Sequence, residues 1–361
     1  MSEIVFVTWD GGGNVPPALA LARGLAERGH AVRFIGHSAQ REPLNRAGFE
    51  VIDAPRARSF TAAGPHSMVS FVRTFGDRGM GRDLCAALER RPADLVVVDC
   101  FLIGVMDVLR RRGIDFVVLE HLYDAYFRAG VLAGPLALAL TASGRRPRRA
   151  VAAARSRLLT TLPALDPVDD RRVCQVGPVV DLTREGAGDP LVLVSLSTFG
   201  FPQMADCLQR IVDACAGLPD RIVVTTGPMI APDELRVPAG VEVHRFVPHA
   251  ELLARARLLI GHGGHGTTMQ ALAHGVPVVV MPMDPTTDQP QVGASLEAIG
   301  AGRVVAKDAS VAELASVIRE LAAPGPHRTV AAELAATIRA TDAVAAGVAH
   351  LEEVLAQPLR A

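Results

Sequence analysis

The sequence has no surplus of either charge. Its 361 residues include 37 Lys and Arg against 38 Asp and Glu, which gives a formal net charge of −1. Proteins that bind nucleic acids or other polyanions present a basic patch and usually carry a basic surplus. The composition therefore predicts no nucleic-acid partner.

Cysteine is scarce and shows no pattern. The five cysteines form no CxxC pair and have no His-rich neighbourhood; they are Cys85, Cys100, Cys174, Cys207 and Cys215. This spacing excludes the common zinc and disulfide frameworks, and no DxD motif indicates a divalent ion. We interpret the cysteines as small core residues of a reduced, cytoplasmic protein, and we expect no metal site.

Long apolar runs are missing as well. The longest, at residues 131–142, holds 12 residues and two helix breakers, which is too short to span a bilayer. The first apolar run, Ile4 to Val7, is too short for a signal peptide. Four arginines between residues 145 and 149 follow the longest run. We interpret this combination as an apolar pocket wall and a solvated basic helix, and we do not expect membrane contact; a membrane-surface motif is the alternative.

Apolar strands alternate regularly with amphipathic helices. Hydrophobic residues make up 49% of the chain, and the mean hydropathy is +0.27. Val/Ile/Leu runs such as residues 94–100 and 115–121 are separated by helical segments, which is typical of parallel strands covered on both faces. A polar, turn-rich stretch at 183–190 precedes a second set of strands.

This pattern predicts an α/β protein with two doubly wound, Rossmann-like domains in tandem. We place the first domain at 1–182, a linker at 183–190, the second domain at 191–340 and a final helix at 341–361. Doubly wound sheets bind ligands at the carboxyl ends of their strands. We therefore expect two crevices that face each other across a central cleft.

The loop WDGGGNVPP, residues 9–17, lies between a strand and a helix, where a phosphate-binding loop would lie. A dinucleotide loop reads G-x-G-x-x-G, with an acidic residue about 20 residues further on. This loop lacks the third glycine at that spacing, and Pro16 and Pro17 remove two of the N–H donors that a phosphate needs. It is not expected to bind a cofactor.

The segment HGGHGTT, residues 262–268, lies between another strand and helix. Its glycines let an anion approach the main chain, and the helix start offers free N–H groups and a positive dipole end. On the next such loop, Asp288 and Gln289 place a carboxylate beside a carboxamide, which suits the hydroxyls of a sugar. A tight turn and a helix N-cap are the structural alternatives for the two motifs taken singly.

These motifs resemble the donor-binding signature of the nucleotide-sugar-dependent glycosyltransferases of family 1, especially the actinobacterial enzymes that decorate antibiotics. That signature reads W/F-x-P-Q, H-x-G-x-x-[ST], G-V-P and D-Q in order. Here residues 246–249 read FVPH, 262–267 read HGGHGT, 275–277 read GVP and 288–289 read DQ. The resemblance implies the GT-B fold, with an acceptor-binding first domain, a donor-binding second domain and a final helix that packs back on the first.

The resemblance also assigns roles within the donor site. Phe246 would stack on the base and the main chain of Val247 would read its edge, while His249 stands where the family has Gln. The remaining positions are His262 with Gly264, Gly266 and Thr267 for the diphosphate, His265, Asp288 and Gln289 for the sugar, and Thr198 on a loop whose hydroxyl reaches the diphosphate. Thr226, at the end of a neighbouring strand, is expected to line the same edge.

The loop at residues 9–17 departs from the family pattern. In the family it reads G-H-x-x-P, and its histidine deprotonates the acceptor. Asn14 occupies that position here, and a carboxamide does not accept a proton at working pH. Asp99, at the end of the strand at 94–100, matches the carboxylate that orients the family's histidine.

The catalytic base is therefore open. Asp10 on the same loop, Asp99 acting directly, and Glu120 or His121 after the strand at 115–121 are the candidates. Asn14 could hydrogen-bond the acceptor or the donor sugar. Asp10 as a turn residue and His121 as the cap of its strand are the structural alternatives. An acidic acceptor would need no base at all.

The acceptor pocket is poorly specified. Apolar and aromatic residues in the segments where this fold builds that pocket are Met68, Phe71, Phe75, Met80, Tyr123, Tyr126 and Phe127. Ordinary core packing is the alternative for each of them.

The sequence thus predicts an inverting, metal-independent glycosyltransferase of antibiotic biosynthesis. It would move a sugar from a dTDP- or UDP-sugar, its co-substrate, to a small apolar natural product, without a further cofactor. A GT-B nucleotide-sugar epimerase and a donor-binding homologue that acts as an inactive partner protein are the alternatives. The acceptor, the sugar and the oligomeric state, a homodimer included, are left open.

Overall fold

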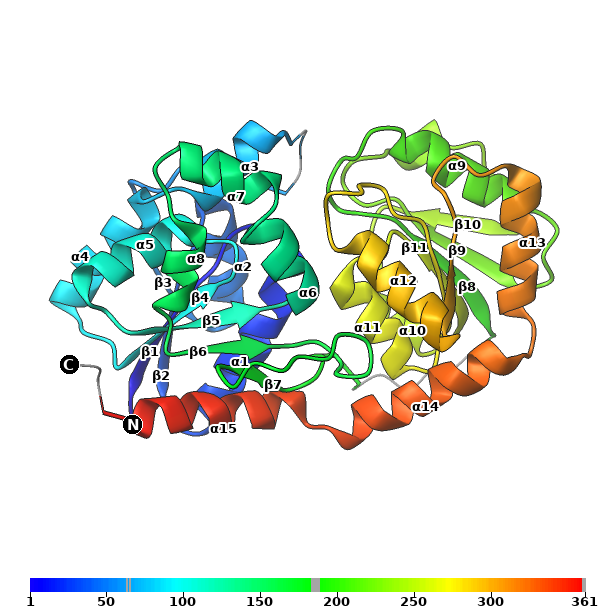
Figure 1. Cartoon of the computed structure of the whole chain (residues 1–361). Coiled ribbons are helices and arrows are strands. Elements are labelled where there is room, and N and C mark those ends of the chain that lie inside the picture. The colour runs from blue at the N-terminus through cyan, green and yellow to red at the C-terminus, as the bar shows by residue number, and fades with distance from the viewer. Residues whose placement is uncertain (63, 65, 183–188, 359–361) are drawn as a thin grey trace. The chain divides into compact units, whose positions relative to one another are not determined.

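The computed structural model describes residues 1–62, 64, 66–182 and 189–358, and the chain divides into two compact units (Figure 1). The first unit comprises Met1–Ala62, His66–Val179 and Asp342–Ala361, and the second comprises Ala63–Pro65 and Val180–Thr341. Residues 183–188 of the predicted linker lie outside the described residues. Each unit is built on a parallel sheet with helices, which confirms the predicted fold class.

The described strands of the first unit form one parallel sheet in the order β3-β2-β1-β4-β5-β6-β7. They are β1 (Glu3–Val7), β2 (Ala31–Ile35), β3 (Glu50–Ile52), β4 (Leu95–Asp99), β5 (Phe116–Glu120), β6 (Ser156–Leu159) and β7 (Val173–Gln175). The strand order reverses between β1 and β4, whose register pairs Ile4 with Leu95. The carboxyl ends of such a pair are where a doubly wound sheet binds its ligand.

The helices of the first unit follow the predicted alternation with the strands. They are α1 (Val15–Glu27), α2 (Arg41–Arg46), α3 (Met68–Phe75), α4 (Gly79–Arg90), α5 (Ile103–Arg112), α6 (Asp124–Tyr126), α7 (Pro135–Ala142), α8 (Pro147–Ala152) and α15 (Ala343–Ala356), with the shorter turns η1 (Ser38–Gln40) and η2 (Phe127–Val131). α1 carries its two prolines in the first turn, where the helix has no acceptor for their missing N–H groups.

The last helix, α15, packs against α1, the first helix of the chain. Two glycines allow the close approach. A Cβ atom on Gly24 would lie 2.8 Å from Val348, and one on Gly347 would lie 2.5 Å from Leu21. Leu351 of α15 is fully buried in the same apolar cluster as Leu21. The C-terminal helix is therefore an integral part of the first unit.

The described strands of the second unit form a parallel sheet in the order β10-β9-β8-β11-β12-β13. They are β8 (Leu191–Ser195), β9 (Arg221–Thr225), β10 (Val241–His244), β11 (Ala256–Gly261), β12 (Val278–Val280) and β13 (Gly302–Val304). Its helices are α9 (Met204–Cys215), η3 (Pro232–Glu234), α10 (His249–Leu253), α11 (His265–Ala273), α12 (Gln289–Ile299), α13 (Val311–Ala322) and α14 (Pro326–Ala340). The order reverses between β8 and β11, so the loops after these strands mark the second ligand position.

Helices lie on both sides of the second sheet (Figure 1). α9 and α13 share an apolar cluster with alternate residues of the strands, among them Val192, Val194 and Ile260. On α12, a Cβ atom on Gly293 would lie 3.1 Å from Val280 Cγ1, so this helix packs closely on β12. The sheet is thus covered as the continuous apolar runs of its strands require.

Among the described residues, no single helix is both long enough and apolar enough to cross a membrane. One bent helix pair, Asp124–Val131 with Pro135–Ala142, passes the same test by length and composition alone.

Truncating Leu351 to alanine is expected to destabilise the first unit. Truncation of a buried leucine typically lowers the free energy of unfolding by about 2–5 kcal/mol. The side chain of Leu351, on α15, is fully buried in the apolar cluster that α15 shares with α1 and the first sheet. The chain contains a single tryptophan, Trp9, which lies in the first unit. Its fluorescence during urea unfolding of the full chain therefore reports on this unit. Glu353→Ala, an exposed position on the same helix, is the control. Equal midpoints for both variants would contradict the packing role of α15.

Candidate functional site

The carboxylate of Asp99 is the centre of a buried hydrogen-bond cluster at the reversal point of the first sheet. Asp99 ends β4 and is 4% exposed. Its Oδ1 accepts hydrogen bonds from Trp9 Nε1 and from the main-chain N–H of Phe101, both at 3.0 Å. Its Oδ2 accepts from Asn14 Nδ2 at 2.8 Å and pairs with His121 Nε2 at 3.0 Å. A carboxylate offers about four lone-pair sites, so all of them are in use.

Asn14 takes part in this cluster through its amide nitrogen. Besides Asp99, Nδ2 donates to the main-chain oxygen of Trp9 at 3.0 Å and to Thr8 Oγ1 at 3.1 Å. The Asp99 carboxylate and the Trp9 main-chain oxygen can only accept, which identifies the atom as the nitrogen, and its two hydrogens are shared among the three partners. The side-chain oxygen Oδ1 is buried and has no hydrogen-bond partner among the described residues. Gly11 lies against it, because a Cβ atom there would come within 2.8 Å of Oδ1.

The side chain of Asp10 contacts the segment after β3. Its carboxylate accepts a hydrogen bond from the main-chain N–H of Ala62 at 3.3 Å, and its own N–H donates to His37 Nδ1 at 3.3 Å. Burial lowers the pKa of His37, and the charge of Asp10 opposes that effect. Asp10 therefore ties its loop to the segment after β3 and is not among the partners of Asp99.

Glu120 belongs to a separate buried network, although it precedes His121 in the chain. It is fully buried and forms a two-point ion pair with Arg157, which also contacts Asp124. Burial raises the pKa of Glu120 to about 7, and Arg157 works against this rise. Its carboxylate is therefore committed to Arg157.

An aromatic cluster adjoins the polar one. The ring of Trp9 lies 4.9 Å from that of Phe75 and 5.7 Å from that of Phe101, centroid to centroid. Phe101 in turn lies 5.9 Å from the His121 ring. Further members are Phe60, His66 and Phe71. Trp9, Phe60 and Phe75 are buried, whereas Phe71, Phe101 and His66 are partly exposed. We call this cluster the aromatic wall; its partly exposed rings are the ones that an apolar molecule could contact.

Sequence reasoning found only part of this wall. Phe71 and Phe75 belong to it. Phe75, like Met80, Tyr123 and Phe127, is almost completely buried. Trp9 and Phe101 were not predicted. Their positions just beyond the ends of β1 and β4, the two strands at the order reversal, were the signal that would have found them.

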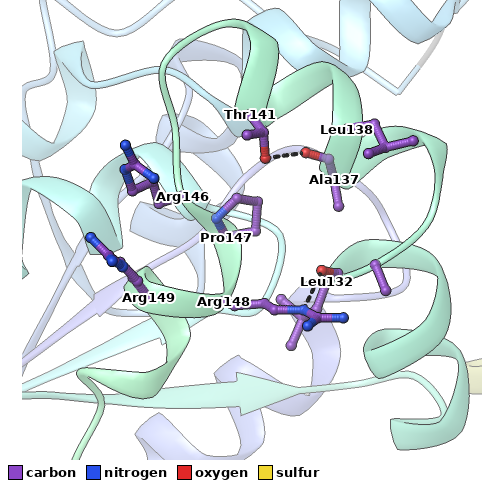
Figure 2. Close-up of a pocket in the computed structure, with 9 residues that line it drawn as sticks. Leu132, Ala137, Leu138, Thr141, Arg146, Pro147, Arg148 and Arg149 are labelled. Carbon is purple, nitrogen blue, oxygen red and sulfur yellow. Dashed lines mark hydrogen bonds between the residues drawn. The ribbon is translucent and has the colours of Figure 1, made fainter.

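A surface pocket of about 310 Å³ lies beside α7 and α8 of the first unit (Figure 2). It is lined by Leu132, Ala133, Ala137, Leu138, Thr141, Arg146, Pro147, Arg148 and Arg149. Leu132 and Leu138 lie on one side and Arg146 and Arg149 on the other (Figure 2). Leu138 is 70% exposed. The pocket combines apolar and basic walls, and none of the predicted catalytic residues lines it.

In the second unit, the HGGHG turn connects β11 to α11 at the order reversal. Gly263 has a φ of +85°, and a Cβ atom there would lie 2.7 Å from Val280 Cγ1. Gly264 precedes the first residue of α11 and lies against the His262 ring, which a Cβ atom would approach to 2.5 Å. The turn therefore needs both glycines, and it exposes the N-terminal N–H groups of a nine-residue helix.

His262 is partly buried beneath this turn. Removal from water lowers the pKa of His262 to about 4, and the nearby His249 adds to the effect, while a main-chain hydrogen bond at Leu196 opposes it. The imidazole is therefore neutral at physiological pH. It acts as a neutral hydrogen-bonding group, without a positive charge to offer an anion.

The side chain of His249 lies against the carboxyl ends of two strands of the second sheet. Its Nε2 lies 3.1 Å from Ser195 Oγ and 3.3 Å from Thr225 Oγ1, at the ends of β8 and β9. Its Nδ1 lies 3.5 Å from Thr267 Oγ1 of α11. Burial lowers the pKa of His249. This histidine links two strand ends to the start of α11.

Asp288 and Gln289 differ in their surroundings. Gln289 is 4% exposed, and its Oε1 accepts hydrogen bonds from the main-chain N–H groups of Met283 at 2.7 Å and Asp284 at 3.3 Å. Its carbonyl oxygen therefore shapes the loop after β12. Asp288 stands at the N-cap position of α12, but its side chain forms no capping hydrogen bond. The N-cap alternative thus does not account for the carboxylate.

The remaining predicted donor-site residues lie on loops at the same sheet edge. Phe246 follows β10 and is 79% exposed, which is unusual for phenylalanine, and Val247 is partly buried. Thr198 is exposed, whereas Thr226 is 3% exposed. His265 and Gly266 open α11, as Thr267 does.

One group of side chains in the described part of the chain has the spacing of metal ligands. The ligand atoms of Asp99, Cys100 and His121 all lie within 4.8 Å of one another. Four hydrogen bonds already occupy the carboxylate of Asp99. Burial and the neighbouring carboxylates raise the pKa of the Cys100 thiol well above its usual value, whereas metals bind the thiolate. This donor set fits a hydrogen-bonded cluster better than a metal centre.

The chain resembles known proteins along nearly its whole length. Residues 209–354 match the family model described as Erythromycin biosynthesis protein CIII-like, C-terminal domain. The 4'-demethylrebeccamycin synthase of Lentzea aerocolonigenes is 28% identical over 97% of this chain and 99% of its own. The demethyllactenocin mycarosyltransferase of Streptomyces fradiae is 29% identical over 79% of this chain and 72% of its own.

Solved structures show the same fold. The calicheamicin glycosyltransferase CalG4 is 22% identical with a TM-score of 0.79 and covers all of both chains. The spinosyn rhamnosyltransferase SpnG, complexed with thymidine diphosphate, is 18% identical with a TM-score of 0.76, over 98% of this chain and 100% of its own. The solved structures show the GT-B fold, and with its signature motifs and these relatives the chain is similar to the family 1 glycosyltransferases of antibiotic and natural-product biosynthesis.

Proposed function

We propose that this glycosyltransferase moves a sugar from a dTDP- or UDP-sugar to a small apolar acceptor, with inversion at the anomeric carbon and without a metal ion. The observation that carries the proposal is the HGGHG turn at the start of α11, at the order reversal of the second sheet. The alternatives, an epimerase and an inactive partner protein, lack support of this kind, since the named relatives are a synthase and a transferase.

The donor diphosphate is assigned to the start of α11. Free N–H groups and the positive end of the helix favour an anion there, and Thr267 adds a hydroxyl. This set needs no cation to hold the leaving group, which supports the metal-independent form of the proposal. SpnG, a structure with this fold, is complexed with thymidine diphosphate.

The nucleobase is assigned to Phe246 and the sugar to Asp288. An aromatic ring that is 79% exposed after β10 offers a stacking surface. Asp288 has a carboxylate that the start of α12 does not use as a cap. Since His249 bonds three hydroxyl groups of its own unit, we assign it the task of holding Thr267 in place.

The acceptor is assigned to the aromatic wall of the first unit. The partly exposed rings of Phe71 and Phe101, which pack on the buried rings of Trp9 and Phe75, offer contacts for an apolar ring system beside a polar cluster. Inversion follows from a single displacement, in which the acceptor oxygen attacks the anomeric carbon as the diphosphate leaves.

Nucleoside diphosphates are expected to stabilise the protein in the presence of EDTA. dTDP and UDP are added to the full chain, and the melting temperature is followed by differential scanning fluorimetry. His262→Asn is expected to weaken dTDP binding about 2- to 12-fold, because a neutral hydrogen bond contributes about 0.5–1.5 kcal/mol. His327→Asn, in the first turn of α14, is the control. Loss of binding in EDTA, or stabilisation by NAD and not by nucleotides, would contradict the assignment.

The low pKa of His262 is expected to make the second unit sensitive to acid. Unfolding returns the ring from a pKa of about 4 to its ordinary value of 6.5. Between pH 6.5 and 4 the unfolded chain therefore binds a proton at this histidine and the folded chain does not. The free energy of unfolding falls as the pH drops through this range, by up to about 3 kcal/mol. Calorimetric unfolding of the full chain and of His262→Asn across this range tests it. The variant should lose less stability than the parent, and parallel profiles would refute the shift.

A further inference from the structure

The pocket beside α7 and α8 lies at a bend in the chain. η2 ends at Val131, α7 begins at Pro135, and the helical segments before and after this break are inclined at 45°. Two glycines permit the bend. A Cβ atom on Gly130 would lie 2.5 Å from the Tyr126 ring, and one on Gly134 would lie 2.6 Å from the main-chain oxygen of Gly130. The pocket is lined by this break, by α7 and by the start of α8.

Two arginines that do not line the pocket anchor the loop between α7 and α8. Arg145 donates from Nε to the main-chain oxygen of Gly76 at 2.7 Å. Arg78 donates to the main-chain oxygen of Gly144 at 2.9 Å and forms an ion pair with the buried Asp107. The arginines that follow in the chain therefore extend into the pocket from an anchored backbone.

Three arginines of the pocket have no opposing charge. In the part of the chain that the structure describes, Arg146, Arg148 and Arg149 form no ion pair with a carboxylate. Arg148 donates from Nε to the main-chain oxygen of Leu132 at 3.2 Å (Figure 2), which fixes the stem of its guanidinium and leaves both terminal amino groups for a ligand. Charges of one sign in a hollow with apolar walls concentrate their field and attract a counter-ion. The pocket is therefore suited to an anion, although the whole chain carries a net charge of −1.

The opposite wall of the pocket is apolar. Leu132 and Leu138 lie across from Arg146 and Arg149 (Figure 2). Leu138 is 70% exposed, so folding has not removed its side chain from water. An apolar group placed on this wall would cover both leucines, which is favourable in proportion to the apolar area removed from water.

We propose that this pocket binds an amphipathic anion, a small molecule with a carboxylate or phosphate head and an apolar tail. The head pairs with the guanidinium groups of Arg146, Arg148 and Arg149, whose planar donors match the oxygens of either head. The tail lies on Leu132 and Leu138. A volume of about 310 Å³ corresponds to about ten water molecules in the liquid, so the ligand has about ten non-hydrogen atoms.

The shape of the pocket favours a single small molecule over a membrane surface. A membrane-binding helix presents its apolar and basic groups on a protruding face that lies in the bilayer interface. Here the two kinds of wall oppose each other across a hollow, as in a ligand pocket that holds one molecule between them (Figure 2).

The pocket belongs to neither of the sites assigned to the substrates. None of its lining residues is among those assigned to the nucleotide, the sugar or the aromatic wall. Its ligand is therefore a further molecule beside donor and acceptor, and its binding does not depend on the proposed transfer.

Octanoate and hexyl phosphate test the ligand class, because both match the pocket in size and combine an anionic head with an apolar tail. Isothermal titration calorimetry of the full chain is expected to show binding of both. Three matched compounds at the same concentration should not bind: 1-octanol lacks the charge, acetate lacks the tail, and octylammonium carries the opposite charge. Affinity for octanoate should also fall when the salt concentration rises from about 0.05 to about 0.5 M, because salt screens exposed charges. Binding of neither anion, or equal binding of octanoate and 1-octanol, would overturn the proposal.

Variants of exposed pocket residues test the location. Arg146→Gln and Arg149→Gln are each expected to weaken octanoate binding about 2- to 10-fold, because each removes one charged donor at a solvent-exposed position. Leu138→Asp should weaken it further, because its carboxylate replaces apolar surface and competes with the head for the arginines. Arg23→Gln, at an exposed arginine on α1 of the same unit, is the matched control and should leave the affinity unchanged. Unchanged melting temperatures show that the variants are folded, and equal affinity in all four would place octanoate elsewhere and overturn the proposal.

Two further measurements distinguish other sources of binding. Excess dTDP, which is assigned to the second unit, should not displace octanoate, and displacement would refute a separate site. Flotation with vesicles of phosphatidylglycerol and phosphatidylcholine tests the membrane. Flotation that requires Arg146, Arg149 and Leu138, in a protein that binds neither octanoate nor hexyl phosphate, would overturn the pocket in favour of a membrane surface.

Discussion

The candidate acceptor site depends on the hydrogen bonds that the carboxylate of Asp99 accepts. It joins the loop after β1, the loop after β4 and the end of β5 through four hydrogen bonds to one buried group. A buried charge without such partners would be costly, so the donors and the carboxylate require one another. The aromatic wall shares this anchor, because Trp9 and Phe101 both belong to it.

The two units place their candidate sites by the same rule of topology. In each sheet the strand order reverses once among the described strands, between β1 and β4 and between β8 and β11. Loops at these points leave in opposite directions and give room to polar groups at the strand ends. The first unit fills its position with a carboxylate, an amide and a histidine. The second fills it with glycines and helix N–H groups, which are suited to an anion.

Two departures from the family pattern have the same structural logic. Asn14 and His249 replace residues to which the resemblance assigns direct roles in catalysis and donor binding. Each is held by hydrogen bonds inside its own unit, Asn14 to Asp99 and His249 to Ser195, Thr225 and Thr267. Both side chains therefore organise neighbouring groups.

The sequence alone determined the α/β class, the doubly wound units and the donor-site motifs. Continuous Val/Ile/Leu runs and the spacing of HGGHGTT and Asp288-Gln289 are local signals, readable from neighbouring residues. The tertiary structure decided which candidate side chains meet. Trp9, Asn14, Asp99 and His121 are separated by up to 112 residues of numbering, and only strand pairing brings them to one carboxylate. It also decided the neutral state of His262, because burial, which sets that pKa, is a property of the folded chain.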